Sequence, residues 1–170
     1  SSSDAILGTS MKSVGEAMAI GRNFKESLQK ALVSLEIGFS GLDRMLYFNK
    51  KELEKNLKKN IPNKILLVAE AIRRKIHIKK IQNLSKIDNW FLEQIKEIVE
   101  AEDKIKKKGL PKNFNEFNKI KSIGFSDKKL SEITKTSEEI IRKKRIALKV
   151  LPVYKKVDTC AAEFKSFTPY

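Results

Sequence analysis

The stretch "SDKKLSEITKTSEEIIRKKR", residues 126–145, decides the fold because its pattern occurs twice. Residues 77–96 read "HIKKIQNLSKIDNWFLEQIK", which places the same kinds of residue 49 positions earlier. In both stretches an amphipathic segment is followed by an N-cap residue type, Asp88 or Ser137, and then by a second apolar pattern with helical spacing. Each stretch therefore predicts a helix, a turn and a second helix, with Asp88 and Ser137 as equivalent N-caps.

The repeat extends beyond these two stretches. Apolar residues match at the same offset of 49 over a longer range: Ile65 with Phe114, Val68 with Phe117, Ala71 with Ile120, Ile76 with Phe125, Ile81 with Leu130, Leu84 with Ile133, Phe91 with Ile140, Leu92 with Ile141 and Val99 with Leu148. A unit of three helices is thus predicted at 65–107 and again at 114–149. Gly109 and Pro111 separate the units, and Gly124 has the place of a helix stop. We predict an all-α fold of repeated three-helix units, with the matched apolar residues buried in both copies.

The N-terminal part has a different pattern. Residues 11–22 contain two glycines and several small residues, and they are compatible with a short strand that ends at Gly21. A helix is predicted next, with Asn23 and Glu26 in a capping-box-like arrangement. The sequence has neither GxxxxGK[ST] nor GxGxxG, so no phosphate loop is indicated. Residues 42–60 predict a connection and a polar, largely solvated helix.

The charge of the chain suggests a second interpretation, a basic helix-turn-helix module that binds nucleic acid. The formal net charge is +15 over 170 residues. However, the helix that would read DNA begins with Ser137, Glu138 and Glu139, and carboxylates in its first turn repel phosphate. The basic excess is also spread along the chain. It amounts to +3 in residues 1–62, +5 in 63–111, +6 in 112–149 and +1 in 150–170. Nucleic-acid binding remains the alternative, and a packing role is favoured.

Several classes of site are not indicated. No run of about 18 apolar residues exists, so no membrane span is predicted. One cysteine, Cys160, and one histidine, His77, leave no disulfide and no zinc set. Cys160 stands near Asp158 and Glu163 without a histidine, so we interpret it as an ordinary half-buried cysteine and His77 as structural. We expect no catalytic, cofactor-binding or metal-binding residue, and a setting in the cytoplasm or an organelle matrix.

Three strings carry a resemblance to a known family. They are "MKSVGEAMAIGRNFKESLQKAL" (11–32), "IDNWFLEQIKEIVEAE" (87–102) and "PVYKKVDTCAAEF" (152–164). Together they resemble the large chain of carbamoyl-phosphate synthase, in that family's order and at about its spacing. The resemblance covers nearly the whole chain and implies a fragment of a longer protein.

The resemblance implies three parts. Residues 4–38 would be the tail of the first ATP-grasp half, which makes carboxyphosphate. Residues 42–150 would be the helical oligomerisation domain. Residues 153–170 would lead into the second ATP-grasp half, which phosphorylates carbamate. The family's binding and catalytic residues lie in the bodies of those halves, so none is carried onto this chain.

The resemblance also implies the setting of the fragment. The parent would make carbamoyl phosphate from bicarbonate, glutamine-derived ammonia and two ATP, using magnesium or manganese and potassium, for arginine or pyrimidine synthesis. The fragment itself would not be an enzyme. Its partners would be other large chains, the adjoining ATP-grasp halves and, in the parent complex, the glutamine amidotransferase small chain.

Two positions depart from the family's common residues. Lys156 stands where arginine is common, which is a mild exchange. Lys75 stands where glycine commonly follows the paired arginines Arg73 and Arg74. Because glycine favours the left-handed C-cap, we expect the helix before Lys75 to run on or to end differently.

Trp90 is the candidate interface residue. On a helix that begins near Asp88, the apolar stripe centres about 130° away from Trp90. Its repeat partner is Glu139, a residue type that expects solvent. A tryptophan at such a position needs cover, either from the apolar run 46–48 of the same chain or from a partner subunit.

Overall fold

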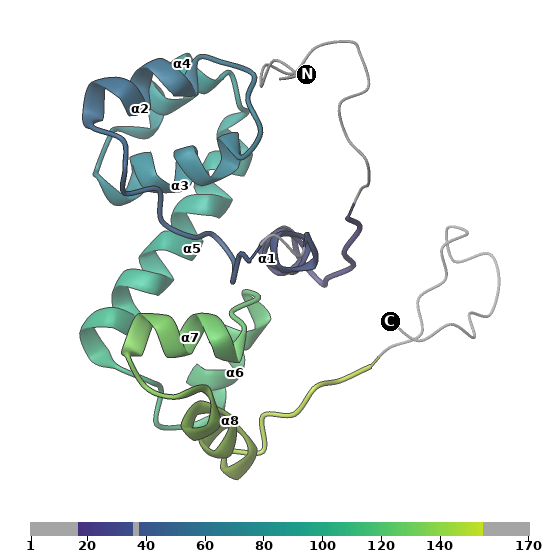
Figure 1. Cartoon of the computed structure of the whole chain (residues 1–170). Helices are drawn as coiled ribbons and strands as arrows, with labels where there is room; N and C mark the ends of the chain where they lie inside the picture. The colour runs from purple at the N-terminus through teal and green to yellow at the C-terminus, as the bar shows by residue number, and fades with distance from the viewer. Residues whose placement is uncertain (1–16, 36–37, 155–170) are drawn as a thin grey trace, which may run out of the picture.

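The computed structural model describes residues 17–35 and 38–154, which form α-helices and connecting segments (Figure 1). Within these ranges no strand occurs, so the all-α prediction is confirmed. The strand considered for 11–22 is absent from residues 17–22, and residues 11–16 lie outside the described residues. The helices are α1 (Phe24–Ser34), α2 (Lys50–Leu57), α3 (Lys64–Arg73), α4 (Ile78–Ser85), α5 (Asn89–Lys108), α6 (Phe114–Ser122), α7 (Asp127–Thr134) and α8 (Glu138–Ala147).

Helix α5 organises the arrangement. With 20 residues it is about 30 Å long. Helices α2, α3 and α4 gather around one end of α5, and α6, α7 and α8 lie at the other end (Figure 1). Helices α3 and α4 pack on α5 from the first unit, α7 packs on it from the second, and α1 packs against it as well. The long helix is therefore shared by both units.

The repeat is confirmed in the backbone. Helices α4 and α7 begin and end 49 residues apart, and α5 and α8 begin 49 residues apart. The Asp88 side chain accepts a hydrogen bond from the Trp90 N–H at 2.8 Å, and the Ser137 hydroxyl accepts one from the Ile140 N–H at 3.4 Å. The two predicted N-caps are thus both in place.

The turns between helices repeat as well. Lys75 and Gly124, which are repeat partners, both have a positive φ, of 60° and 97°. The Ile76 N–H donates to the Ala71 carbonyl at 3.0 Å, which is the 6→1 bond of a Schellman motif. The expectation that loss of glycine at 75 changes the end of the helix is wrong. The buried Ile76 anchors the turn, and lysine adopts the left-handed conformation there.

Most of the matched apolar residues are buried, but three are exposed and five are only partly buried, namely Ile65, Leu84, Ile120, Ile133 and Leu148. Phe91 and Ile140, which are repeat partners, are 40% and 55% exposed, and Phe114 is 47% exposed. All three lie in the first turn of their helices. Side chains on a helix tilt towards its N-terminus, so these three extend past the neighbouring helices. For them the prediction of burial is wrong.

Candidate interaction surface and ionic junction

A buried carboxylate lies at the centre of the first unit. Glu70 of α3 is 0% exposed, and its Oε1 accepts hydrogen bonds from Arg74 Nε at 2.9 Å and Arg44 Nη2 at 3.3 Å. Burial alone would raise the pKa of Glu70, but the bonds from Arg44 and Arg74 and the charge of Arg73 outweigh it and hold the pKa below its usual range. Glu70 is therefore a buried anion paired with cations, and its removal would leave them uncompensated.

Arg73 joins α3 to α5 and to the segment before α2. Its Nη2 contacts Glu102 Oε2 of α5 at 2.7 Å. The same guanidinium donates to the backbone carbonyls of Leu42 and Asp43. The Arg73 side chain is only 6% exposed, so it makes these contacts largely away from water. It thereby fixes the 42–43 backbone on the first unit.

The second unit binds the same segment from the other side. Lys129 Nζ of α7 contacts Asp43 Oδ1 at 2.6 Å, and the Ser40 hydroxyl donates to Glu132 Oε2 of α7 at 2.6 Å. Burial by itself raises the pKa of Asp43, but hydrogen bonds from Lys129 and Ser40 outweigh it and lower the pKa below its usual value. Residues 40–44 thus connect the two units. We call these contacts of Glu70, Arg73, Asp43 and Lys129 the ionic junction.

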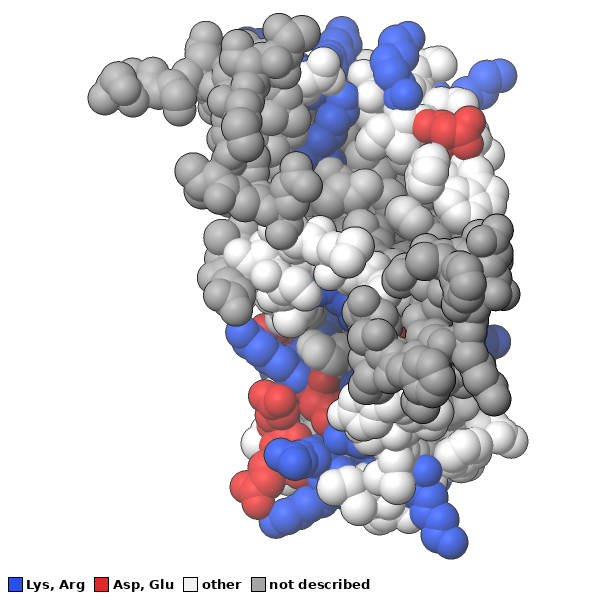
Figure 2. Space-filling model, turned by 90° about the vertical axis from the view of Figure 1, so that its right-hand side faces the viewer, with Lys and Arg blue, Asp and Glu red and all other residues white. Residues whose placement is uncertain are grey.

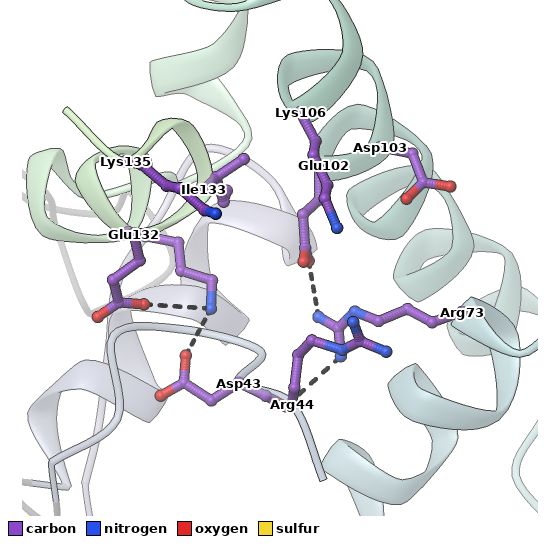
Figure 3. Close-up of a pocket in the computed structure, with 10 residues that line it drawn as sticks. Asp43, Arg44, Arg73, Glu102, Asp103, Lys106, Glu132, Ile133 and Lys135 are labelled. Atoms are coloured by element: carbon purple, nitrogen blue, oxygen red, sulfur yellow. Dashed lines mark hydrogen bonds and ion pairs between the residues drawn. The ribbon is translucent and has the colours of Figure 1, made fainter. Parts of the chain in front are cut away.

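The ionic junction borders a cleft of about 440 Å³. Figure 3 shows that its lining side chains come from α3, α5, the segment before α2, and α7 with its C-cap, and that Glu102 points towards Arg73. The lining residues are Asp43, Arg44, Arg73, Glu102, Asp103, Lys106, Lys129, Glu132, Ile133 and Lys135. Both signs of charge are present, and several of these groups pair with each other. These paired charges are better suited to holding the helices together than to binding a free cation or anion.

Trp90 lies in a cluster of three aromatic rings on the surface of α1 and α5. It is 53% exposed, and its ring centroid lies 5.4 Å from that of Phe24 and 5.0 Å from that of Phe91. Phe24 and Phe91 lie 5.2 Å apart. We call these three residues the aromatic cluster. The rings meet edge to face, which is a favoured geometry for aromatic pairs.

The partial cover of Trp90 comes from α1. The run 46–48 was the intrachain alternative, but its Leu46 and Tyr47 are themselves 65% and 70% exposed, and Phe24 makes the contact instead. That part of the prediction is wrong, because a contact between segments so far apart in sequence depends on tertiary packing. About half of the Trp90 side chain remains available to a second molecule.

The other residues considered from the sequence are His77 and the three residues around Cys160. His77 is the N-cap of α4, and its Nδ1 accepts a hydrogen bond from the Lys79 N–H at 3.2 Å, in line with a structural role. Cys160, Asp158 and Glu163 lie outside the described residues. Among the residues described, no three His, Cys, Asp or Glu side chains are grouped to hold a metal ion, and no helix is long and apolar enough to cross a membrane.

The ionic junction was not found from the sequence. One signal was present in Glu70, a carboxylate within the apolar run of residues 65–72. A charged residue on an otherwise apolar helix face needs a partner when the helix is buried. The two arginines that follow the run were available as such partners. No sequence pattern indicated that Asp43 and Lys129 form a partly buried ion pair, since both look like ordinary surface residues in the sequence.

Both signs of charge occur on the surface. On the face seen in Figure 2, Lys and Arg side chains lie near both ends, and Asp and Glu side chains gather in the lower part.

Comparison with known proteins gives a consistent picture. Residues 16–149 match the family described as the oligomerisation domain of the carbamoyl-phosphate synthetase large chain. The chain is 47% identical to a carbamoyl phosphate synthase large chain from Brucella melitensis, over 99% of this chain and 15% of that protein. It is 46% identical to a chloroplastic, arginine-specific large chain from Arabidopsis thaliana, over 99% and 15% of the two chains, and to a large chain from Thermus thermophilus, over 96% and 16%. The chain therefore spans about 15% of the length of these relatives.

Proposed function

Because the chain belongs to the family of the carbamoyl-phosphate synthetase large-chain oligomerisation domain, we propose that it is a non-catalytic helical domain through which large chains associate. The observation that supports this best is the aromatic cluster. Trp90 is 53% exposed and Phe91 is 40% exposed on one surface. Tryptophan and phenylalanine are enriched at the centres of protein interfaces, where their burial contributes most of the binding free energy.

The proposal includes a second role, as a connection within a longer chain. Helix α1 precedes the repeated units and packs against α5. The Gln29 side chain of α1 donates to the Ile123 carbonyl at 2.9 Å, and the Asn23 side chain donates to the Ser122 carbonyl at 3.0 Å. A segment that enters through α1 would thereby be held on the helical domain. We propose that the first ATP-grasp half is connected to the helical domain in this way.

The parent would be a carbon–nitrogen ligase, as the names of the relatives suggest. We propose that it makes carbamoyl phosphate from bicarbonate, ammonia derived from glutamine by a small amidotransferase chain, and two ATP. ATP with magnesium or manganese, and potassium, would bind outside these residues. The setting would be the cytoplasm or an organelle matrix, and the arginine-specific relatives suggest a role in arginine synthesis.

The isolated chain should not turn over ATP. Neither the ionic junction nor the aromatic cluster contains a nucleophile with a paired base or a phosphate loop. Phosphate release from ATP should equal that of a protein-free blank. Turnover above the blank that a substitution within these residues abolishes would contradict the non-catalytic part of the proposal.

Association is tested by sedimentation equilibrium of the 170-residue chain over a wide range of concentration, in the absence of nucleic acid. We expect the average mass to rise from that of one chain, 19.5 kDa, towards a multiple of it. A mass that stays at 19.5 kDa up to about millimolar concentration, where a dissociation constant corresponds to only about 4 kcal/mol, would contradict association through this chain.

A further inference from the structure

One exposed stripe of α5 separates its charges along the helix axis. At 100° per residue, seven residues lie within about 100° of one another. We call them the outer stripe, and they are Trp90, Glu93, Glu97, Glu100, Lys104, Lys107 and Lys108. All are exposed apart from Glu93, which is half-exposed. In order along the stripe they give one aromatic residue, three carboxylates and three ammonium groups.

The helix dipole does not account for this order. Residues 89–103 contain five acidic residues and one basic residue, whereas 104–108 contain four lysines. Lysines in the last turn of a helix are favourable, but the favourable place for carboxylates is the first turn, and α5 has none there. An acidic segment of this length also stands out in a chain with a net charge of +15.

The charges of the outer stripe are complementary to those of a second outer stripe that runs in the opposite direction. When two such helices lie antiparallel, the acidic segment of each faces the lysines of the other, and both halves of the contact are attractive. A parallel arrangement would place like charges together. An antiparallel pair is also compatible with two-fold symmetry, in which both copies use the same surface.

We infer that two copies of this chain associate through antiparallel contact of their outer stripes, with the aromatic cluster at each end of the contact. This inference rests on the proposed function and names the surface and the partner. In the register that sets the acidic segment against the lysines, Trp90 of one copy lies just beyond Lys108 of the other, and the long lysine side chain can reach over the indole ring. The complementary charges allow two chains of high positive charge to approach each other.

The geometry also predicts the kind of association. One helix pair about 30 Å long, with Phe24 and Phe91 at its ends, buries less than a typical stable interface. Exposed ion pairs are screened by salt over about 8 Å at physiological ionic strength. Association should therefore be reversible and should weaken as salt is added, with no nucleic acid present.

Charge reversal tests the inference in the 170-residue chain by sedimentation equilibrium at low salt. One variant is E93K/E100K and the other is K104E/K107E. Glu97 is left in place because it pairs with Lys25 of α1. Each variant alone places like charges on both halves of the contact, so each should lose association by at least about tenfold. An equimolar mixture should regain it, because the lysines of one variant then face the carboxylates of the other.

The control is K51E/K55E on α2, which makes the same change in net charge as K104E/K107E at exposed lysines of another helix. It should associate as the wild-type chain does. Far-UV circular dichroism should show that every variant keeps its helices. If the wild-type chain associates but the mixture of reversed variants stays monomeric, the antiparallel contact is wrong and the proposed function stands. A wild-type chain that remains monomeric overturns both.

Discussion

Phe24 of α1 and Trp90 of α5 meet edge to face, with ring centroids 5.4 Å apart and ring planes at 61°. This contact joins a helix that precedes both repeated units to the long helix that the units share. The family match begins at residue 16 and so includes α1. The assignment of 4–38 to the first ATP-grasp half stays a prediction. Within residues 4–38, helix α1 packs against α5 of the helical domain.

The packing of α1 should make Gly124 sensitive to substitution. A Cβ atom added at Gly124 would lie 3.0 Å from the Cα of Glu26 in α1, and φ at Gly124 is +97°. Gly109 offers a matched control, because its φ is +76° but no atom lies within 4 Å of such a Cβ. Gly109→Ala should lower the free energy of unfolding by about 1–3 kcal/mol through backbone strain alone, because its φ of 76° and ψ of −169° lie in a region essentially restricted to glycine. Gly124→Ala should cost about 1–3 kcal/mol from overpacking in addition to its own backbone strain.

Urea unfolding followed by circular dichroism measures both glycine variants. Equal losses for Gly124→Ala and Gly109→Ala would show that α1 is not held closely against the turn at Gly124.

Glu70→Gln should destabilise the fold by about 3 kcal/mol, because it removes a buried anion and leaves the surrounding guanidinium groups uncompensated. Glu139→Gln is the control. Glu139 forms an ion pair with Lys143 at 2.7 Å, but both side chains are about three-quarters exposed, so its loss should cost less than about 0.5 kcal/mol. Thermal unfolding at pH 7 gives both values. Similar values for the two variants would mean that Glu70 is not part of a buried ionic network.

The same carboxylate predicts a dependence on pH. The pKa of Glu70 is lowered from 4.5 in the folded state, so the unfolded chain binds more protons than the folded one in the acid range. Its contribution to stability is therefore complete above about pH 4.5 and is lost as the pH falls through the folded pKa. The free energy of unfolding of wild-type protein should fall more steeply with acid than that of Glu70→Gln. Parallel curves would contradict a lowered pKa at Glu70.

Lys75→Gly should stabilise the chain by up to about 1 kcal/mol. Lys75 has φ +60°, a conformation that costs a lysine but not a glycine. Lys58, the C-cap of α2, has φ −76° and is the control, because glycine there gains nothing from a left-handed conformation. The midpoint of urea unfolding should rise for Lys75→Gly and fall or stay unchanged for Lys58→Gly. A fall for both would show that the Lys75 turn is not strained.

The repeat was the part of the fold that the sequence predicted best. Local signals determine where α4, α7, α5 and α8 begin, since an N-cap and a 3.6-residue period lie within each segment. The comparison of the two copies then strengthens each signal. Burial at helix ends was predicted less well, because it depends on which neighbours extend that far, as at Phe91 and Ile140.

The site was less predictable than the fold. Trp90 could be singled out because an aromatic ring off the apolar stripe is visible in one helix. Its neighbour Phe24 and the ionic junction could not, because Asp43, Arg73 and Lys129 come from three segments that only the tertiary fold brings together. Long charged residues usually indicate solvated surface, and no local pattern distinguishes the few that form buried pairs.

Trp90 also contributes directly to the proposed association. Trp90→Ala should weaken association by about tenfold or more, because tryptophan is a frequent interface hot spot. The midpoint of urea unfolding should fall only modestly, since Trp90 is 53% exposed in the single chain and loses two edge-to-face ring contacts. Sedimentation equilibrium and urea unfolding measure the two quantities. A variant that associates normally but unfolds at lower urea would assign Trp90 to the core.

The most direct measurement uses Trp90 as its own probe, because it is the one tryptophan among the 170 residues. Its emission maximum and its quenching by acrylamide should be recorded across the concentration range in which sedimentation equilibrium shows association. If the copies associate at this surface, the emission should shift to shorter wavelength and quenching should fall, with the same midpoint as the change in mass. A change in mass with no change in emission or quenching would show that the chains associate elsewhere.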